Sequence, residues 1–384
     1  MHTNLVAHTL KVVSSGHTSA AALRYAIVGA GMMGIEHIHA LRSLPNTDIV
    51  ALCDPHGPSI TAAQRALGSD SHPVSIFDAP EALVAAGGFD VAVVASPNFT
   101  PRAVVETLLH SGAHLLIEKP LCTSTVDCRE LMQIDNDTHR TGRVVWVGLE
   151  YRYMAPTMRL LEQLRNDVLG PLRMLSIREH RFPFLVKIND WNRFSANTGG
   201  TLVEKCCHFF DLMRLVLRSE PTRVFASGGQ DVNHLEERYD GRVPDILDNA
   251  FVIVDFANGA RAALDLCMFA EATKNEQEIS VVGELGKIEA LVTEGVVRVG
   301  LRADGWFQAK QEVVQTRDVP VSVLQHGAHH GSSWREHVAM QHAIRNGTSA
   351  EVTLHDGLMS VAMGEAAHRS IDLGRPVMMA EVLA

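Results

Sequence analysis

The feature that most constrains the fold is a glycine-rich turn near the start of the chain. Gly29, Gly31 and Gly34 have the spacing Gly-x-Gly-x-x-Gly. The turn follows a short apolar run, 25–28, that predicts a strand, and it precedes a stretch, 35–44, that predicts a helix. In this context the first glycine permits a tight turn, the second lets a pyrophosphate approach the backbone, and the third lets helix and strand pack closely. The sequence therefore predicts a dinucleotide-binding turn whose helix N-terminus faces the phosphates.

An acidic residue stands where such a fold needs one. Asp54 ends the next apolar run, 48–53, and lies 20 residues after Gly34. A carboxylate at this position accepts hydrogen bonds from the adenosine ribose hydroxyls. The residues at 55–57 (Pro-His-Gly) include no arginine or lysine to bind a 2′-phosphate, so NAD is favoured over NADP. The alternative is a glycine turn in an unrelated βαβ unit, which the agreement of strand, helix and acid disfavours.

Composition excludes several classes of protein. The chain has 384 residues, enough for two domains, and its 46% hydrophobic and 20% charged residues are typical of soluble globular proteins. A net charge of −10 argues against a nucleic-acid partner. No apolar run reaches the roughly 18 residues of a transmembrane helix, so we expect no membrane partner. Residues 1–23 lack the features of a signal peptide and predict a flexible extension.

The cysteines predict reduced thiols in a cytoplasmic protein, because they form neither a disulfide framework nor paired Cys-x-x-Cys motifs. They are Cys53, Cys122, Cys128, Cys206, Cys207 and Cys267. Cys206-Cys207-His208 invites a metal interpretation. However, adjacent cysteines on a helix point about 100° apart and chelate poorly, so we expect no metal.

The order of apolar segments predicts an α/β protein with two domains. Between 24 and 148, short strands alternate with helical stretches, which is typical of a doubly wound parallel sheet of the Rossmann type. Between 149 and 384, strand-like segments are joined by hairpin signals such as Asn258-Gly259, which predict an α/β domain with a large, open, mostly antiparallel sheet. We expect 24–148 to bind the cofactor and 149–384 to bind the substrate.

Polar residues follow the strands of the first domain, at the edge where ligands bind in doubly wound sheets. These residues are Asp54, Ser96-Pro97-Asn98 and Glu118-Lys119. Lys119 is a catalytic candidate, because a lysine facing a nicotinamide can hold a substrate hydroxyl and ease its deprotonation, with partial burial lowering its pKa towards neutrality. A solvated lysine at a strand end is the alternative.

A second candidate site lies in the other domain. Apolar periodicity from Leu202 to Leu217 predicts one helix, on which Glu204 and His208 are four residues apart and Asp211 follows three residues later. A carboxylate beside an imidazole orients it and raises its basicity, so His208 can take a proton from an alcohol. A structural Glu–His pair on a helix surface is the alternative.

Taken together, these motifs resemble the Gfo/Idh/MocA family of glucose–fructose oxidoreductase, inositol dehydrogenase and rhizopine catabolism proteins. The resemblance extends from Arg24 to the C-terminus and includes Glu118-Lys119-Pro120, Trp191, Gly199-Gly200, His208-x-x-Asp211 and 336–376. It implies a Rossmann domain, an α/β domain whose open sheet often forms oligomer contacts, and oxidation of a sugar or cyclitol hydroxyl, or the reverse, with NAD(P). We therefore expect a homodimer or homotetramer formed through the C-terminal sheet.

The resemblance also implies roles for individual residues. Lys119 resembles the catalytic lysine and His208 the acid/base, with Glu204 where many members carry aspartate. Two departures from the family pattern occur: Pro101 stands where a histidine is common, and Asn192 interrupts the Trp–Arg pair. The expected cofactor-binding residues are Gly29, Gly31, Met32, Met33, Gly34, Asp54, Ser96, Pro97, Asn98, Glu118 and Lys119. The expected substrate-binding residues are Tyr151, Arg152, Trp191 and Arg193.

The resulting hypothesis is an NAD-dependent dehydrogenase acting on a secondary hydroxyl of an inositol, polyol or sugar. His208, oriented by Glu204, removes the proton while Lys119 polarises the oxygen. A keto-sugar reductase, a non-catalytic NAD(H)-binding sensor and a glycosidase acting through transient oxidation are the alternatives. The histidines at 326, 329 and 330 are interpreted as part of a polar surface loop rather than a loop that closes over the site.

Overall fold

The computed structural model describes residues 21–69, 72–138, 140–326 and 329–384. Most of the predicted extension, 1–20, lies outside the described residues. In the described part of the chain, no helix is long and apolar enough to cross a membrane.

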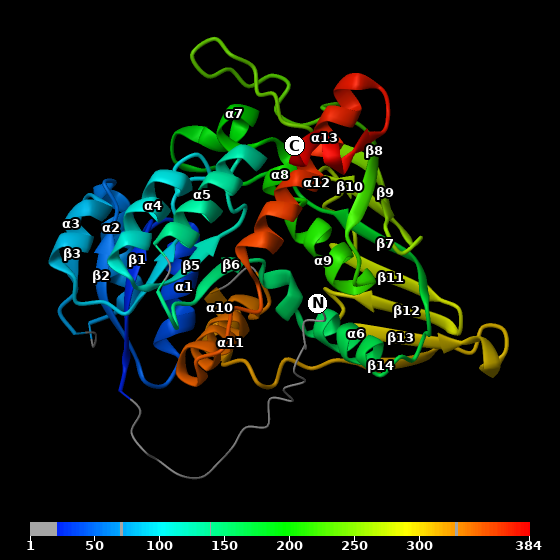
Figure 1. The fold of residues 1–384 in the computed structure, drawn as a ribbon, viewed down its shortest axis with the longest axis horizontal. Coiled ribbons are helices and arrows are strands. Elements are labelled where there is room, and N and C mark those ends of the chain that lie inside the picture. Colours follow the sequence, from blue (N-terminus) through cyan, green and yellow to red (C-terminus); the bar gives the residue numbers. More distant parts are fainter. Residues whose placement is uncertain (1–20, 70–71, 139, 327–328) are drawn as a thin grey trace.

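The first domain forms a six-stranded parallel sheet between residues 23 and 148, with the strand order β3-β2-β1-β4-β5-β6 (Figure 1). Its strands are β1 (Leu23–Val28), β2 (Thr47–Cys53), β3 (Ser75–Phe77), β4 (Val91–Val94), β5 (His114–Glu118) and β6 (Val145–Gly148). Its helices are α1 (Met32–Arg42), α2 (Gly57–Leu67), α3 (Pro80–Ala86), α4 (Pro101–Ser111) and α5 (Thr125–Asp137). The central strands are fully buried, as their continuous apolar runs require, and the predicted Rossmann-type sheet is confirmed.

The second sheet has nine strands in the order β14-β13-β12-β11-β7-β10-β9-β8-β15, and only β7 and β10 pair in parallel. Its strands are β7 (Leu172–His180), β8 (Pro221–Gly229), β9 (Asn249–Phe256), β10 (Arg261–Cys267), β11 (Gln277–Gly283), β12 (Gly286–Leu291), β13 (Val296–Leu301), β14 (Lys310–Val313) and β15 (Val377–Met378). The predicted large, mostly antiparallel sheet is therefore confirmed.

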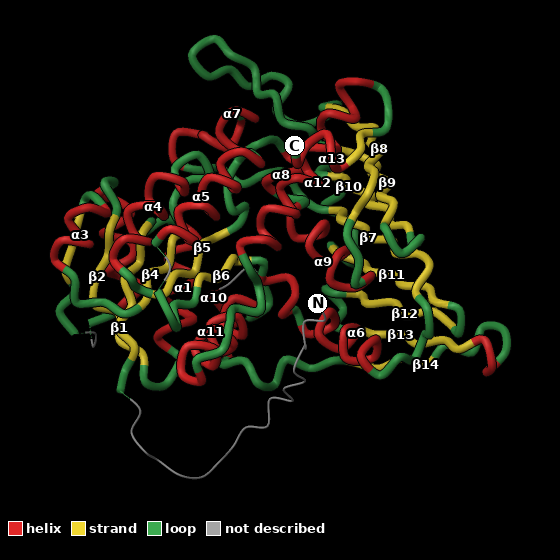
Figure 2. The backbone as a smooth tube through the Cα atoms, in the orientation of Figure 1, coloured by secondary structure: helices red, strands yellow, loops and turns green. Residues whose placement is uncertain are grey.

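Helices α8 (Thr201–Glu204), α9 (Cys207–Leu217) and α12 (Leu354–Leu373) lie between the two sheets (Figure 2). The other helices after β6 are η1 (Glu150–Tyr153), α6 (Ala155–Arg165), η2 (Ile188–Arg193), α7 (Ser195–Thr198), η3 (Arg302–Asp304), α10 (Val321–His326), α11 (Ser332–Asn346) and α13 (Met379–Leu383). Helices α6, α9 and α12 contact one face of the second sheet, while α10 and α11 contact α1 in the first domain. The last third of the chain therefore packs against both sheets.

The single helix predicted from Leu202 to Leu217 is wrong, because the chain turns at 205–206 between α8 and α9. The carbonyl oxygen of Glu204 accepts hydrogen bonds from Lys119 Nζ at 3.3 Å and from Cys207 Sγ at 3.5 Å. Side chains thus satisfy a carbonyl at the break, which an uninterrupted helix would pair with a backbone N–H. Apolar periodicity shows which face is buried but carries no signal for this break.

Candidate active site

The glycine turn has the geometry of a pyrophosphate cradle. Gly29 has a positive φ of 93°, and a Cβ there would lie 2.5 Å from the Ala95 carbonyl carbon. A Cβ on Gly34 would collide with the Gly29 carbonyl oxygen, so these two positions require glycine for packing. Around Gly31, in contrast, no heavy atom lies within 4 Å of the Cβ position. The backbone therefore leaves open space where α1 begins with Met32 and Met33, and this space fits a dinucleotide phosphate.

Asp54 lies beside this turn. Its Oδ2 accepts a hydrogen bond from the Ala30 N–H at 2.7 Å, and its Oδ1 accepts one from the His56 N–H at 2.8 Å. These bonds fix the carboxylate at the end of β2, next to the glycine cradle. Since each carboxylate oxygen has a second lone pair, the group retains acceptor capacity for ribose hydroxyls.

The residues after β4, which are also predicted to contact the cofactor, lie around a small cavity. Asn98 Nδ2 is buried and has no hydrogen-bond partner among the described residues, which leaves a donor available to a ligand. Asn98 lines a cavity of about 220 Å³ together with Phe99 and Cys122. The Ser96 hydroxyl accepts a hydrogen bond from the Thr100 hydroxyl, and Phe99 meets Trp191 edge to face. Trp191 therefore lies beside the predicted cofactor contacts.

Glu118 points into the interior rather than towards the cradle. Its Oε1 lies 2.8 Å from His37 Nε2, and His37 Nδ1 lies 2.9 Å from His337 Nε2. These buried side-chain hydrogen bonds join β5 to α1 and α11.

Lys119 is partly buried next to the break between α8 and α9, where its Nζ donates to the Glu204 carbonyl. Burial acts to lower the pKa of Lys119, but Cys207 and the carboxylates of Glu204, Glu150 and Glu118 raise it above its ordinary value. The predicted lowering towards neutrality is therefore wrong. Lys119 remains an ammonium group that donates hydrogen bonds.

His208 is buried, with 2% of its side chain exposed, and its ring stacks on Tyr151 at a centroid distance of 4.0 Å. Burial lowers the pKa of His208 well below its ordinary value, and the positive charges of Lys119 and Lys205 lower it further. The imidazole is therefore neutral at pH 7 and able to accept a proton. His208 Nδ1 has no hydrogen-bond partner among the described residues.

The carboxylate that faces His208 is Glu150, not Glu204. Glu150 Oε1 lies 3.7 Å from His208 Nε2, whereas the described residues form no ion pair between Glu204 and His208. Burial raises the pKa of Glu204 to about 7, and the positive charges of Lys119 and Lys187 oppose that rise. The break in the helix explains the difference, because Glu204 and His208 no longer lie one regular turn apart.

Two functional candidates were not found by sequence reasoning. His329, predicted in a polar surface loop, has Nδ1 2.9 Å from Glu36 Oε1 and Nε2 3.6 Å from Glu150 Oε1. Lys205 Nζ donates to the Tyr151 hydroxyl at 2.6 Å and pairs with Glu179 at 2.8 Å. His329 and Glu36 are 293 residues apart, so no local pattern could reveal their contact. The only indication in the sequence of a functional role for this segment was the pair of adjacent histidines, His329 and His330.

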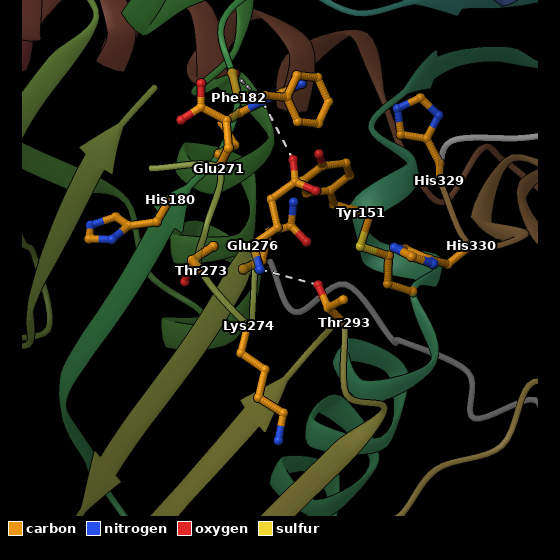
Figure 3. A pocket seen from close by; sticks show the side chains of 13 residues that line it. Tyr151, His180, Phe182, Glu271, Thr273, Lys274, Glu276, Thr293, His329 and His330 are labelled. Atoms are coloured by element: carbon orange, nitrogen blue, oxygen red, sulfur yellow. Dashed lines mark hydrogen bonds and ion pairs between the residues drawn. The ribbon is translucent and has the colours of Figure 1, made fainter. Parts of the chain in front are cut away.

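A cavity of about 310 Å³ is lined by Tyr151, the residue whose ring stacks on His208 (Figure 3). Tyr151 and His329 line it from the helical side, while His180 and Lys274 line it from the second sheet. Its walls carry aromatic, cationic and anionic side chains, which suits a polar ligand with several hydroxyls.

Two of the expected substrate residues are occupied by internal pairs. Arg152 Nε donates to Asp211 Oδ2 at 2.6 Å, and Arg193 Nε donates to Glu237 Oε2 at 3.0 Å. Both arginines are buried, so their guanidinium groups hold helices and loops in place. We therefore leave Arg152 and Arg193 out of the substrate site proposed below.

Fold and site together define an NAD-binding protein of the Rossmann class with a second domain over the cofactor edge. The family model described as "Oxidoreductase family, NAD-binding Rossmann fold" matches residues 23–149, and the model described as "Oxidoreductase family, C-terminal alpha/beta domain" matches residues 161–379. The chain belongs to the Gfo/Idh/MocA oxidoreductase family.

Known relatives are similar over most of the chain, and some over nearly all of it. The myo-inositol 2-dehydrogenase of Thermotoga maritima is 23% identical over 94% of this chain and 100% of its own length. The D-glucoside 3-dehydrogenase of Escherichia coli is 27% identical over 62% of this chain and 68% of its own length. An oxidoreductase from Agrobacterium radiobacter, solved in complex with NAD+, L-tartaric acid and magnesium, has a TM-score of 0.76 at 19% identity over 94% and 99% of the two chains. These relatives support the family and the fold.

Proposed function

We propose that the chain is an NAD-dependent dehydrogenase that oxidises a secondary hydroxyl of an inositol, polyol or sugar. The observation that carries the proposal is a neutral, buried His208 whose pKa is lowered by burial and by the positive charge of Lys119, which follows β5 at the same edge of the parallel sheet as the glycine turn after β1. One group accepts a proton and the other stabilises an oxygen that becomes negative, which is what removing a hydride from an alcohol requires. Relatives named as inositol and glucoside dehydrogenases support the substrate class.

His208 and Lys119 have different roles because one is neutral and the other is charged. His208 takes the hydroxyl proton, because burial keeps its imidazole unprotonated. Lys119 donates a hydrogen bond to the substrate oxygen and holds its growing negative charge. Bound NAD supplies the hydride acceptor.

The preference for NAD over NADP rests on Asp54. Its carboxylate is fixed beside the cradle, and a 2′-phosphate there would meet a negative charge. The proposed cradle comprises Gly29, Gly31, Met32, Met33, Gly34, Asp54, Ser96, Pro97 and Asn98. Tyr151, which lines the cavity and stacks on His208, is the proposed substrate contact, with Trp191 beside the cofactor.

The test is NADH formation with a panel of inositols, aldoses and glycosides, run with NAD and NADP separately. We expect turnover with NAD and a decrease of about 10²–10⁴-fold in kcat for Lys119→Ala and for His208→Ala, the range for loss of a positioned proton-transfer group. Lys287→Ala and His355→Ala, at exposed positions outside the site, are the controls and should retain activity. Tight NADH binding without turnover on either hydroxyl or keto substrates would favour the non-catalytic sensor.

A further inference from the structure

Glu150 is a buried carboxylate that the proposed chemistry does not use. It follows β6 as the first residue of η1, is 1% exposed, and has no hydrogen-bond partner for either carboxylate oxygen among the described residues. Leaving a buried carboxylate without a donor costs free energy and calls for an explanation in function.

The same oxygen of Glu150 lies between two imidazoles. Glu150 Oε1 is 3.7 Å from His208 Nε2 and 3.6 Å from His329 Nε2. These distances are somewhat longer than a hydrogen bond, as is common for catalytic groups in a ligand-free site, which tighten when substrate binds. His208, Glu150 and His329 thus form a continuous line of proton-accepting groups.

His329 is the outer end of this line. Its side chain lines the 310 Å³ cavity (Figure 3). The His329 side chain is 20% exposed, whereas His208 and Glu150 are almost completely buried. Hydrogen bonds from His329 and Ser333 hold the pKa of Glu36 at about 2, although burial acts to raise it. The ionised Glu36 therefore accepts the Nδ1–H of His329, which leaves Nε2 free to face Glu150.

The surrounding charges suit a group that gains and loses a proton near neutral pH. Lys119, Glu118, Glu336, His208 and His329 face Glu150, and burial raises the pKa of Glu150 to about 7. Glu36, Glu150, Lys205 and His330 face His329. Burial acts to lower the pKa of His329, but Glu36 and Glu150 raise it above its ordinary value. A transfer group with a pKa near the working pH passes protons in both directions.

We propose that Glu150 and His329 carry the substrate proton from His208 to the solvent-facing cavity. The O–H proton of the substrate moves to His208 Nε2, then to Glu150 Oε1, then to His329 Nε2, and finally to water or a buffer base in the cavity. Only N–H and O–H bonds form and break, and each group returns to its starting protonation state after release. This inference rests on the proposed function, whose hydride and electron pair go to the cofactor.

The kinetic test uses Glu150→Gln and His329→Gln. At low buffer concentration we expect each variant to lower kcat by about tenfold or more and to increase the solvent deuterium isotope effect on kcat. Increasing imidazole should restore the rate of His329→Gln, because a small base can take the place of the missing ring at the cavity wall. Glu130→Gln, at an exposed position, and His355→Gln are the matched controls. Loss of rate without restoration by imidazole would indicate a positioning role and overturn the relay.

A second measurement does not depend on turnover. Histidine-labelled protein is titrated by NMR, with the His329 signal assigned by its absence in His329→Gln. Glu150→Gln should lower the pKa of His329, because a negative charge beside the imidazole is removed. An unchanged pKa would contradict the coupling. If the wild type turns over and Glu150→Gln and His329→Gln have the same kcat as the wild type, the relay is overturned and the proposed function stands. If the wild type shows no turnover, the proposed function itself is overturned.

Discussion

At the scale of residues, the candidate site contains two basic side chains, Lys119 and His208. Burial acts to lower the pKa of both, but only the pKa of His208 falls below its ordinary value. Cys207 and the carboxylates of Glu204, Glu150 and Glu118 offset the effect of burial on Lys119, which keeps its proton. His208 lies close to the positive charges of Lys119 and Lys205 and loses its proton. Neither state follows from the residue type alone, because an uncompensated buried lysine would also become neutral. The neighbours therefore decide which group acts as the base.

This arrangement predicts the pH dependence of the reaction. His208 accepts a proton only when neutral, and its lowered pKa means that it stays neutral below the ordinary histidine value of about 6.5. For alcohol oxidation, log kcat/KM should therefore begin to fall only as the pH drops below about 6.5. The profile is measured with saturating NAD at constant ionic strength.

A control separates His208 from the two carboxyl groups that titrate near neutrality. Burial raises the pKa of Glu204 and of Glu150 to about 7, so protonation of either would produce a limb at higher pH than that of His208. A limb near pH 7 that disappears in Glu204→Gln or in Glu150→Gln would assign the profile to that carboxyl group and contradict the prediction for His208.

At the scale of elements, two glycines in the turn between β1 and α1 are needed for different reasons: Gly31 for ligand binding and Gly34 for packing. Gly31 has an ordinary φ of −76° and open space at its Cβ position, whereas Gly34 packs against the Gly29 carbonyl. Gly31→Ala should fold normally and weaken NADH binding by about tenfold or more, because the methyl group occupies the phosphate space. Gly34→Ala should lower the free energy of unfolding by about 1–3 kcal/mol through overpacking.

Thermal unfolding and NADH fluorescence titration distinguish these two effects. Each variant serves as the control for the other, since the same methyl group is added at positions three residues apart. Equal loss of stability in both variants would contradict the open cradle at Gly31, and normal NADH binding by Gly31→Ala would contradict its proximity to the phosphates.

Elements with strong local signals could be predicted from the sequence. The glycine spacing, the acid at Asp54 and the apolar strands report local backbone requirements, and both sheets formed as expected. The partner of His208 could not be predicted in this way. Glu150 reaches it from another element, and at the helix break that separates Glu204 from His208 the Glu204 carbonyl accepts a hydrogen bond from Lys119, which follows β5. Tertiary contacts of this kind leave no periodic pattern.

At the scale of the whole molecule, the C-terminal helices join the two domains at the site. Helices α10 and α11 contact α1, and His329, which precedes α11, lies within hydrogen-bond distance of Glu36 on α1. The same region connects through His337 to His37 and Glu118. The cofactor domain and the proposed proton path therefore share one buried polar interface.

The face of the second sheet that points away from helices α6, α9 and α12 carries exposed apolar side chains and predicts a homo-oligomer interface. Phe225, Phe251 and Ile253 are exposed on adjacent strands β8 and β9, where Ile253 pairs with Phe225, and Phe251 is 66% exposed. Contiguous apolar surface of this kind is typical of a protein interface.

We expect a dimer or tetramer by light scattering at micromolar concentration, and Phe251→Asp should shift it towards monomer because a carboxylate would be desolvated in the interface. Val126→Asp, at an exposed apolar position on α5, should not change the assembly. A monomeric wild type, or an unchanged Phe251→Asp oligomer, would show that this face is not the interface.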